Sequence, residues 1–458
     1  MKRKYNFYSL FALILLMMSA CNKQLDLVPE NNLVEEQVLA DKATAERLLA
    51  GGFINQYSTE RTILPMADQS TGIAYLVTNN FYTGVLDPYQ SNIAGFWSTH
   101  YKAINIANVI INNLPREAKF DISIQKQYIA EAKFLRAYSY FRLALLFGYK
   151  VLGDNSDANP CVPLQLNPFA SASVIIPRAT NKQVLDRVVQ DLEEAIPDLP
   201  SAYPDAANMD MKLRSRAVKA VGMAFLSRVY LYLNNFDKAI DNANLVLANN
   251  NYVLAASPAN VFPDNKLVIA GAANISFNKE VVYGYPVSFG ISTTNLAYVV
   301  DPSFIQTYTP NDIRGSMVIK NAQNQNTTSK YSSPAFYDNI MVIRLSEVML
   351  NKAEALARRD GLNQTSIDIL NAIYQRAFVV GQKPAFYTMA SFADKNALVS
   401  RILLERRWEL AYEGHDRFDK IRAGLPINPV LPLNRYALPI PQADVDITSG
   451  VLAQNLGY

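Results

Sequence analysis

The fold is decided by residues 216–250, which read RAVKAVGMAFLSRVYLYLNNFDKAIDNANLVLANN. Apolar residues recur at three- and four-residue steps on both sides of Asn234-Asn235, as they do on one face of an α-helix. Small residues such as Ala224 and Ala243 stand where two helix backbones would approach closely. The stretch therefore predicts two amphipathic helices joined by a short turn. This pattern is typical of a tetratricopeptide hairpin, whose repeat is about 34 residues long.

One such hairpin cannot bury both of its faces, and about three are needed for a stable stack. We therefore expect an all-α fold, a tetratricopeptide-like helical-repeat scaffold with loop-rich insertions and little β structure. Further helical patterns supply the partners, near 43–57, 96–148 with 181–200, 340–379 and 396–422. Two insertions rich in Pro, Asn and aromatic residues interrupt them, at 149–179 and 252–337. Residues 21–458 are expected to form one domain.

The N-terminus predicts a secretion signal over residues 1–20. Three basic residues at positions 2–4 precede an apolar run that is too short to span a bilayer. The signal closes with Ser19-Ala20 directly before Cys21, which indicates a bacterial lipoprotein whose cysteine is acylated and becomes the new N-terminus. Two or three acyl chains anchor a protein stably. The alternative, an ordinary signal peptide with an incidental cysteine, stays open.

Charge and cysteine content narrow the classes of function. The chain has 43 Lys and Arg against 40 Asp and Glu, and the signal carries three of the basic residues. The remaining chain is therefore balanced, which gives no support for nucleic-acid binding. The only other cysteine is Cys161, so no disulfide is expected and a buried, inert thiol is the favoured interpretation.

Short motifs along the chain resemble those of the SusD/RagB family of outer-membrane nutrient-binding lipoproteins from Bacteroidota. The residues that carry the resemblance are Cys21 with Leu25-Asp26-Leu27-Val28-Pro29, Trp97 with Tyr101, Ile104 and Ala107-Asn108, the run Glu131 to Ala137, Arg344 with Glu347 and Ala353-Glu354-Ala355, the run Glu405 to Leu410, and Glu413-Gly414 with Arg417 and Asp419. Their order and spacing cover nearly the whole chain. One departure is His415-Asp416, which lengthens the usual link between Glu-Gly and the arginine.

The resemblance implies a function. A member of this family is expected to be lipid-anchored in the outer membrane and to face the cell exterior. It is expected to bind a nutrient, most often a glycan or oligosaccharide, and to deliver it to a SusC-like TonB-dependent transporter. An alternative stays open, since helical repeats also serve as protein-binding scaffolds or assembly factors at the outer membrane.

An enzyme is the less favoured interpretation. Glu405, Glu409 and Glu413 recur every four residues and share a helix face, as a pair of glycosidase carboxylates would. Arginines are interleaved with them, however, and arginine keeps a carboxylate ionised, which is the wrong state for a general acid. We therefore expect an ion-pair network and no catalytic residues. The two histidines, His100 and His415, do not stand at metal-ligand spacing, so no metal or other cofactor is expected.

Aromatic residues coincide with Asn, Thr and Ser in two non-helical stretches, 74–82 and 283–298. Aromatic rings pack on the C–H faces of sugars, while amide and hydroxyl groups bind the sugar hydroxyls. We therefore expect the ligand site on these loops. The candidate residues are Tyr75, Phe81, Tyr82, Tyr283, Tyr285, Phe289 and Tyr298. A competing interpretation stays open for each of them, in which the ring packs its loop against the helices. At helical spacing, Trp97 is expected in the core.

Overall fold

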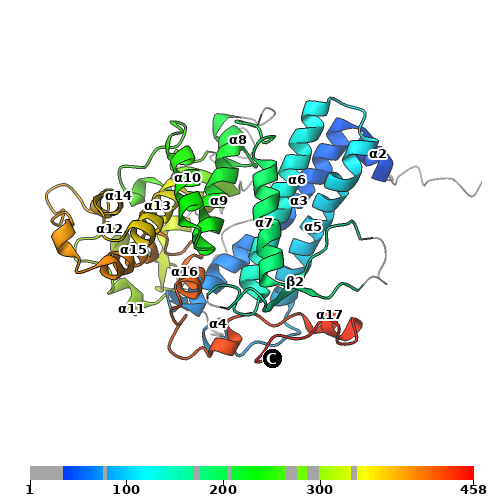
Figure 1. Cartoon of the computed structure of the whole chain (residues 1–458). Helices are drawn as coiled ribbons and strands as arrows, with labels where there is room; N and C mark the ends of the chain where they lie inside the picture. Colours follow the sequence, from blue (N-terminus) through cyan, green and yellow to red (C-terminus); the bar gives the residue numbers. More distant parts are fainter. Residues whose placement is uncertain are drawn as a thin grey trace, which may run out of the picture.

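The structure is a computed structural model that describes residues 35–75, 80–153, 155–169, 175–203, 208–263, 276–285, 299–331 and 338–458. Helices dominate this part of the chain, and its strands form only two-stranded sheets (Figure 1). The predicted fold class, a tetratricopeptide-like all-α scaffold with little β structure, is confirmed. The signal 1–20 and Cys21 lie outside the described residues.

Helices follow one another along nearly the whole described chain. The α-helices are α2 (Glu35–Ala40), α3 (Lys42–Ser70), α4 (Asn80–Thr83), α5 (Ser91–Glu117), α6 (Ile122–Phe147), α7 (Asn181–Ala195), α8 (Met209–Arg214), α9 (Lys219–Tyr232), α10 (Phe236–Leu247), α11 (Pro302–Ile305), α12 (Ile313–Ser316), α13 (Leu345–Asp360), α14 (Gln364–Gln375), α15 (Lys395–Glu409), α16 (Asp416–Arg422) and α17 (Gln442–Ile447). The strands are β1 (Ala74–Tyr75), β2 (Pro160–Pro163), β3 (Arg178–Thr180), β4 (Val281–Tyr285), β5 (Val299–Val300), β6 (Val318–Lys320), β7 (Asn326–Thr328) and β8 (Ile340–Arg344). They pair antiparallel as β1–β5, β2–β3, β4–β8 and β6–β7.

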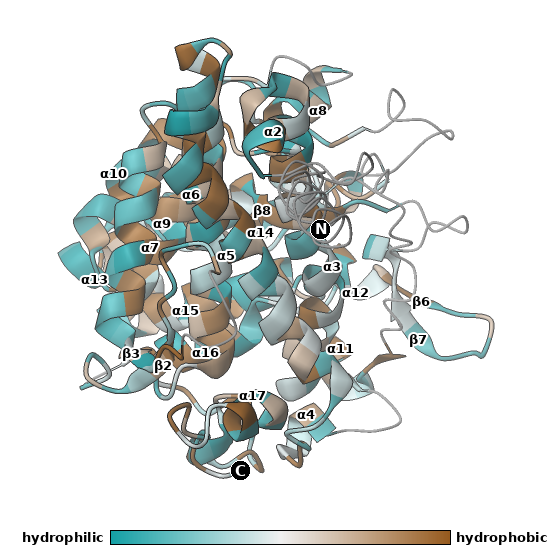
Figure 2. Ribbon diagram, turned by 90° about the vertical axis from the view of Figure 1, so that its right-hand side faces the viewer, coloured by the Kyte–Doolittle hydropathy of each residue, from teal (hydrophilic) through white to brown (hydrophobic). Residues whose placement is uncertain are grey.

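The long helices pack side by side. Helix α5 lies between α3 and α6, and α6 packs on α7; in the other half, α10 lies between α9 and α13, and α13 packs on α14 and α15 (Figure 1). The hairpin predicted from 216–250 is present as α9 and α10. Hydrophobic residues are concentrated on α6, which is enclosed by its neighbours (Figure 2). The main core therefore runs along the helix-to-helix contacts, as a helical repeat requires.

The turn between α9 and α10 shows how the sequence closes this hairpin. Asn234 takes a left-handed conformation, with φ of 57°, where the repeat usually has glycine. Asparagine tolerates this conformation better than most residues. The next residue, Asn235, caps α10, because its side-chain oxygen accepts a hydrogen bond from the backbone N–H of Lys238 at 3.3 Å.

Helix α3 is longer than its apolar pattern predicts. The pattern indicates an end near Tyr57, but the helix continues to Ser70. Its second half buries polar side chains, among them Glu60 and Asp68, and these interrupt the apolar stripe. Glu60 is buried because Arg142 of α6 donates to it at 2.6 and 2.8 Å. A helix whose buried face depends on ion pairs cannot be recognised from hydrophobic periodicity alone.

A buried ion-pair network fastens the insertion 252–337 to α15. Glu409 accepts from Arg314 of that insertion at 3.3 Å and from Arg344 at 3.0 Å. Glu405 also pairs with Arg314, at 2.5 Å, and Glu413 pairs with Arg344 at 2.7 Å. The expected ion-pair network of these three glutamates is thus confirmed. Most of its arginines come from distant segments instead of from α15 itself.

Both histidines are buried without charge. Burial lowers the pKa of His100 to about 3, and the nearby Arg142 lowers it further in the same direction. The Nε2 atom of His100 lies 3.4 Å from the hydroxyl of Thr59. Burial likewise holds the pKa of His415 well below its usual value. In the unfolded chain both imidazoles take up a proton near pH 6.5, so protons favour the unfolded state below that pH.

We therefore expect the free energy of unfolding to fall as the pH drops from 7 to 5. The contribution of His100 should be about 2 kcal/mol, because its folded pKa lies below that window and its unfolded pKa lies within it. Urea unfolding at pH 7 and pH 5 measures this for the parent and for His100→Gln. The contributions of all other titrating groups are the same in both proteins, so they cancel when the pH dependence of one is subtracted from that of the other. Equal pH dependence in the two proteins would contradict a neutral, buried His100.

Candidate functional site

The structure places the first predicted ligand stretch beside the residues that directly follow the second one. Strand β1, from the first stretch, pairs with β5, which directly follows the second stretch, and Tyr75 stands opposite Val299. The backbone N–H of Asp301 also donates to the carbonyl of Ile73 at 3.1 Å. We call residues 73–75, 80–83 and 299–301 the β1–β5 edge. Segments that are far apart in the sequence therefore present their side chains at one place.

Helix α4 is tied to the same edge. The side-chain amide of Asn428 donates to the carbonyls of Ser70, at 2.7 Å, and of Tyr82, at 2.8 Å. Gly72 turns the chain between α3 and β1 with φ of 77°, and a Cβ atom there would lie 3.4 Å from the ring of Tyr82. The ring of Tyr82 thus packs beside the turn that leads into β1. Tyr75 and Tyr82 belong to one small, well-anchored unit.

The three predicted rings at the β1–β5 edge differ in exposure. Tyr75 is 40% exposed, so one face of its ring is open to a ligand. Tyr82 is half-buried. Phe81 is buried and belongs to the main hydrophobic core. Tyr75 and Tyr82 can therefore contact a ligand directly, whereas Phe81 holds α4 in position.

The expectation that Tyr283 and Tyr285 are exposed loop residues is wrong. Both are buried, at 0% and 2% exposed, because β4 pairs with β8 and all of its residues are buried within the fold. The ring of Tyr283 lies edge-on to Phe134 of α6, at 5.6 Å between centroids. The ring of Tyr285 lies 3.8 Å from that of Tyr57 on α3. These tyrosines attach the insertion to the scaffold and offer no ring face to a ligand.

The remaining predicted residues are placed as follows. Phe289 and Tyr298 lie outside the described residues. Trp97 is 5% exposed and packs against Phe147, which confirms its place in the core. Cys161 is fully buried, and burial raises the pKa of its thiol to about 12. The prediction of a buried, unreactive thiol is confirmed, since the thiolate is the reactive form.

Beneath the β1–β5 edge lies a second hydrophobic cluster. Ile73, Ala74 and Val300 of the edge pack into it together with Phe304 and Tyr412. The ring of Phe304 lies edge-on to that of Tyr412, at 6.0 Å between centroids. This cluster makes the edge a rigid platform, because close-packed side chains keep single conformations.

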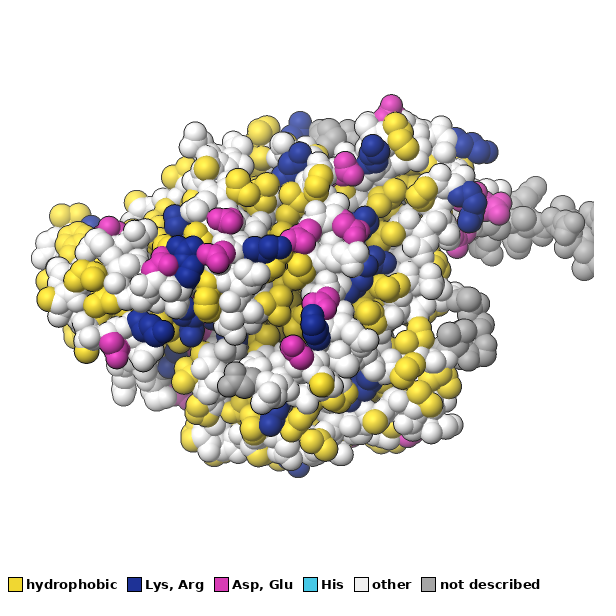
Figure 3. Space-filling model, viewed as in Figure 1, with side chains coloured by type: hydrophobic (Ala, Val, Ile, Leu, Met, Phe, Trp, Pro, Cys, Tyr) yellow, Lys and Arg dark blue, Asp and Glu magenta, His cyan; other side chains and the backbone are white. Residues whose placement is uncertain are grey.

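No group of three His, Cys, Asp or Glu side chains in the described ranges is arranged to hold a metal ion. No helix among the same residues combines the length and apolar character that a membrane crossing needs. On the face shown in Figure 3, basic and acidic side chains are interspersed over the helices.

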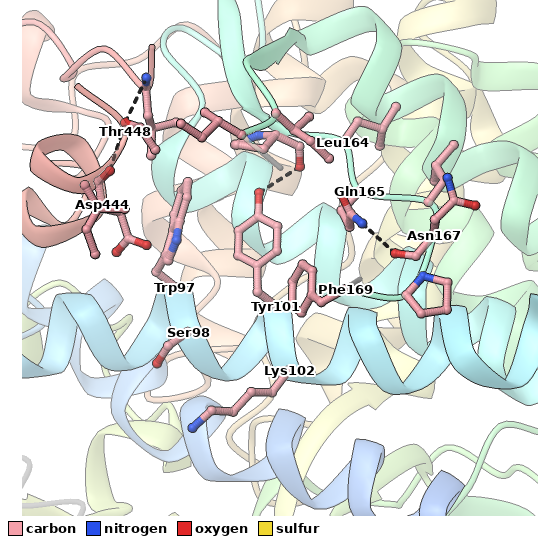
Figure 4. Close-up of a pocket in the computed structure, with 17 residues that line it drawn as sticks. Trp97, Ser98, Tyr101, Lys102, Leu164, Gln165, Asn167, Phe169, Asp444 and Thr448 are labelled. Carbon is pink, nitrogen blue, oxygen red and sulfur yellow. Dashed lines mark hydrogen bonds between the residues drawn. The ribbon is translucent and has the colours of Figure 1, made fainter. Parts of the chain in front are cut away.

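A cavity beside Trp97 was not indicated by the sequence patterns. It lies between α5, the segment 163–169 and the C-terminal tail (Figure 4). The signal that could have revealed it is a row of asparagines on α5, Asn105, Asn108 and Asn112, which recur at three- and four-residue steps. When polar residues repeat on one face of an otherwise apolar helix, they indicate that another segment of the chain is held against that face by hydrogen bonds from their side chains.

The fold and the β1–β5 edge define a tetratricopeptide-like helical-repeat protein with a loop-built edge that exposes aromatic side chains. A family model described as "Starch-binding associating with outer membrane" matches residues 22–231, and the model of the SusD family matches residues 272–428. The chain belongs to the SusD/RagB family. The family is one of carbohydrate-binding proteins associated with the outer membrane.

Individual relatives agree over nearly the full length. The SusD-like protein P38 of Formosa agariphila is 23% identical, and the match covers 94% of each chain. A SusD superfamily protein of Bacteroides vulgatus superposes with a TM-score of 0.74 at 21% identity, covering 92% of this chain and 99% of that one. A SusD-like carbohydrate binding protein of the same organism superposes with a TM-score of 0.70 at 20% identity, covering 85% of each. At these identities the superpositions establish the fold.

Proposed function

We propose that this protein is a lipid-anchored outer-membrane protein that captures a glycan or oligosaccharide at the cell surface and delivers it to a SusC-like TonB-dependent transporter. Membership of a carbohydrate-binding family supports the ligand class. The motif that ends in Cys21 supports the lipid anchor, and the resemblance to the SusD/RagB family supports an outward-facing position. The observation that supports the location of the site is the pairing of β1 with β5, which brings the exposed Tyr75 of the first stretch beside the residues that directly follow the second stretch.

The β1–β5 edge has the chemistry that a saccharide needs. The exposed ring of Tyr75 offers an apolar face for sugar C–H groups, and Tyr82 lies on the same unit. Asn80 and Thr83 of α4, both exposed, supply amide and hydroxyl groups at its border. The buried hydrophobic cluster below keeps the edge in place, so a ligand need not order it on binding.

The proposal assigns no catalytic step to the chain. The carboxylates that could have served a glycosidase form ion pairs with arginines. Burial alone would raise the pKa of Glu409, but the charges of Arg376, Arg344 and Arg314 outweigh this effect and lower it. A carboxylate held ionised cannot act as a general acid at neutral pH. The protein is proposed to bind and pass on its ligand unchanged.

The ligand class is tested with a glycan array, followed by calorimetric titration of whichever oligosaccharide binds. A nutrient-binding protein should bind soluble oligosaccharides, whereas a protein-binding scaffold should not. Delivery is tested separately by purifying the tagged protein from membranes and identifying partners that co-purify. Recovery without any TonB-dependent barrel would contradict the transporter half of the proposal and leave the glycan half standing.

We expect Tyr75→Ala to weaken binding of that oligosaccharide about tenfold, since one stacking ring contributes on the order of 1 kcal/mol. The fold should be unaffected, because Tyr75 is 40% exposed. The measurement is titration of the parent, Tyr75→Ala, Tyr82→Ala and Phe386→Ala. The last variant is a matched control, since Phe386 is an exposed ring, at 66%, on the loop between α14 and α15 and does not belong to the β1–β5 edge. If both edge variants bind like the control, the ligand binds elsewhere.

A further inference from the structure

A cavity of about 780 Å³ is lined mostly by aliphatic and aromatic side chains. Trp97 and Tyr101 of α5 border it on one side, and Leu164 and Leu166 on another. Ile447 at the end of α17 also lines it, and Figure 4 shows Asp444 of the same helix on the third side. Its volume and apolar lining are typical of small-molecule sites, which occupy about 300–1,000 Å³ and carry only a few polar groups.

The wall 163–169 is fixed in place by side chains of α5. Asn108 donates to the carbonyls of Gln165, at 3.0 Å, and Asn167, at 3.1 Å. Asn112 donates to the carbonyl of Leu166 at 3.1 Å. The hydroxyl of Tyr101 donates to the carbonyl of Pro163 at 2.7 Å. Four backbone carbonyls of this wall are therefore bound by side chains of α5, and these bonds hold the wall in place before any ligand arrives.

The C-terminal wall is fixed as firmly. Arg178 donates to the side-chain oxygen of Asn455 at 2.7 Å and to the carbonyl of Ala453 at 3.0 Å. The amide of Asn455 donates in turn to the carbonyls of Phe147, at 2.8 Å, and Leu438, at 2.7 Å. These contacts hold α17 and the residues after it beside the cavity. Both walls are thus preorganised, which reduces the entropy lost on binding.

Apolar side chains at the mouth of the cavity are exposed to solvent. Phe169 is 54% exposed, Ile175 43% and Ile447 79%. Figure 3 shows hydrophobic side chains gathered over α17 at the lower right of the molecule. Apolar residues that line a cavity and remain exposed at its mouth indicate a binding site for an apolar group.

Asp444 of α17 is the acidic residue in the lining of the cavity. Its carboxylate is half-buried in the cavity, and no described residue donates a hydrogen bond to it or forms an ion pair with it. Burial raises its pKa. Lys102 is the other charged residue of the lining, but it is exposed, and Figure 4 shows it pointing away from Trp97 and Tyr101. A ligand among the apolar walls therefore meets a negative charge that has no partner within the described protein.

We propose that the cavity binds a small amphiphile, with a hydrocarbon or aromatic body and a neutral or positively charged head group that donates hydrogen bonds to Asp444. The body would leave water for the apolar walls. The head group would satisfy a carboxylate that is otherwise costly to desolvate. An anionic head group would be repelled by the same carboxylate. This site is separate from the β1–β5 edge and does not depend on carbohydrate binding there.

Three probes of equal chain length test the assignment: octylammonium, 1-octanol and octanoate, each titrated calorimetrically into the full-length protein below its micellar concentration. We expect octylammonium and octanol to bind, and octanoate to bind at least about tenfold more weakly, since the chains are equal and only the head group differs. In Asp444→Asn the preference for octylammonium over octanoate should shrink to about twofold or less, because the charge is removed and the shape is kept.

Two further variants locate the binding. Ile447→Ser should weaken all three probes by a similar factor, and it should fold normally because Ile447 is 79% exposed. Tyr75→Ala, at the β1–β5 edge, should change none of them. The proposal is overturned if no probe binds at millimolar concentration, if the three bind equally to the parent, or if Ile447→Ser leaves all affinities unchanged. Each of these outcomes leaves the carbohydrate proposal as it was.

Discussion

Replacing Glu409 with glutamine is expected to lower the free energy of unfolding by about 3–5 kcal/mol, because it removes one negative charge from a buried ion-pair network and leaves positive charge there in excess. Glu409 is fully buried and accepts from three arginines, Arg376 at 2.6 Å, Arg344 at 3.0 Å and Arg314 at 3.3 Å. Glutamine keeps the shape of the side chain but removes the charge. The three guanidinium groups keep other carboxylate partners, Glu405, Glu280 and Glu413, but lose the one carboxylate that joins all three in a region that water does not reach.

The measurement is urea unfolding followed by circular dichroism at pH 7. Glu194→Gln is the matched control, since Glu194 pairs with Lys133 at 2.8 Å but is 40% exposed. An exposed ion pair contributes only about 0–1 kcal/mol. If Glu409→Gln costs no more than this control, the buried network does not stabilise the fold.

The same substitution has a local consequence. Arg314 belongs to the insertion 252–337, and its side chain reaches α15 through Glu405 and Glu409. We expect the insertion to open more often in Glu409→Gln than α5 and α6 do. Hydrogen exchange measures this by region. The β1–β5 edge is built partly on that insertion, so the network supports the proposed ligand site from below.

Helical periodicity was sufficient to predict the scaffold. The apolar stripes of 216–250 predicted α9 and α10, and such stripes are visible in a single sequence; α10 buries one face as predicted, whereas α9 is buried along nearly its whole surface. Buried charge was harder to place. The four-residue spacing of Glu405, Glu409 and Glu413 indicated an ion-pair network, but the partners Arg314 and Arg344 lie far away in the chain. Sequence spacing gives no information about contacts between distant segments.

The proposed ligand site could be predicted from the sequence only in part. Tyr75 and Tyr283 stand in similar surroundings in the sequence, since both lie in short non-helical stretches rich in polar and aromatic residues. Tyr75 is exposed because β1 lies at the surface, whereas Tyr283 is buried because β4 is covered on both faces. The difference is made by the elements that pack over each strand. Composition predicted the kind of residue a site needs, and tertiary packing decided which of them a ligand can reach.

Cys21 is the single residue whose replacement is expected to have the largest effect on where the protein is found. We expect Cys21→Ser to move the protein from the membrane fraction to the soluble fraction, because serine cannot carry the thioether-linked lipid. Each acyl chain contributes about 0.8 kcal/mol per buried CH₂, and two or three chains together hold a protein stably on a membrane. The measurement is sedimentation of membranes, with incorporation of a labelled fatty acid as a second readout.

Cys161→Ala is the matched control, since it removes the only other thiol of the chain. Cys161 is fully buried, so an acyltransferase cannot reach it in the folded protein. This variant should therefore keep both the label and the membrane association, whereas Cys21→Ser should lose both. The experiment is done in a strain that lacks partner barrels, because binding to a transporter could hold an unlipidated protein at the membrane. Continued sedimentation of Cys21→Ser in that strain would show that something other than acyl chains attaches the protein.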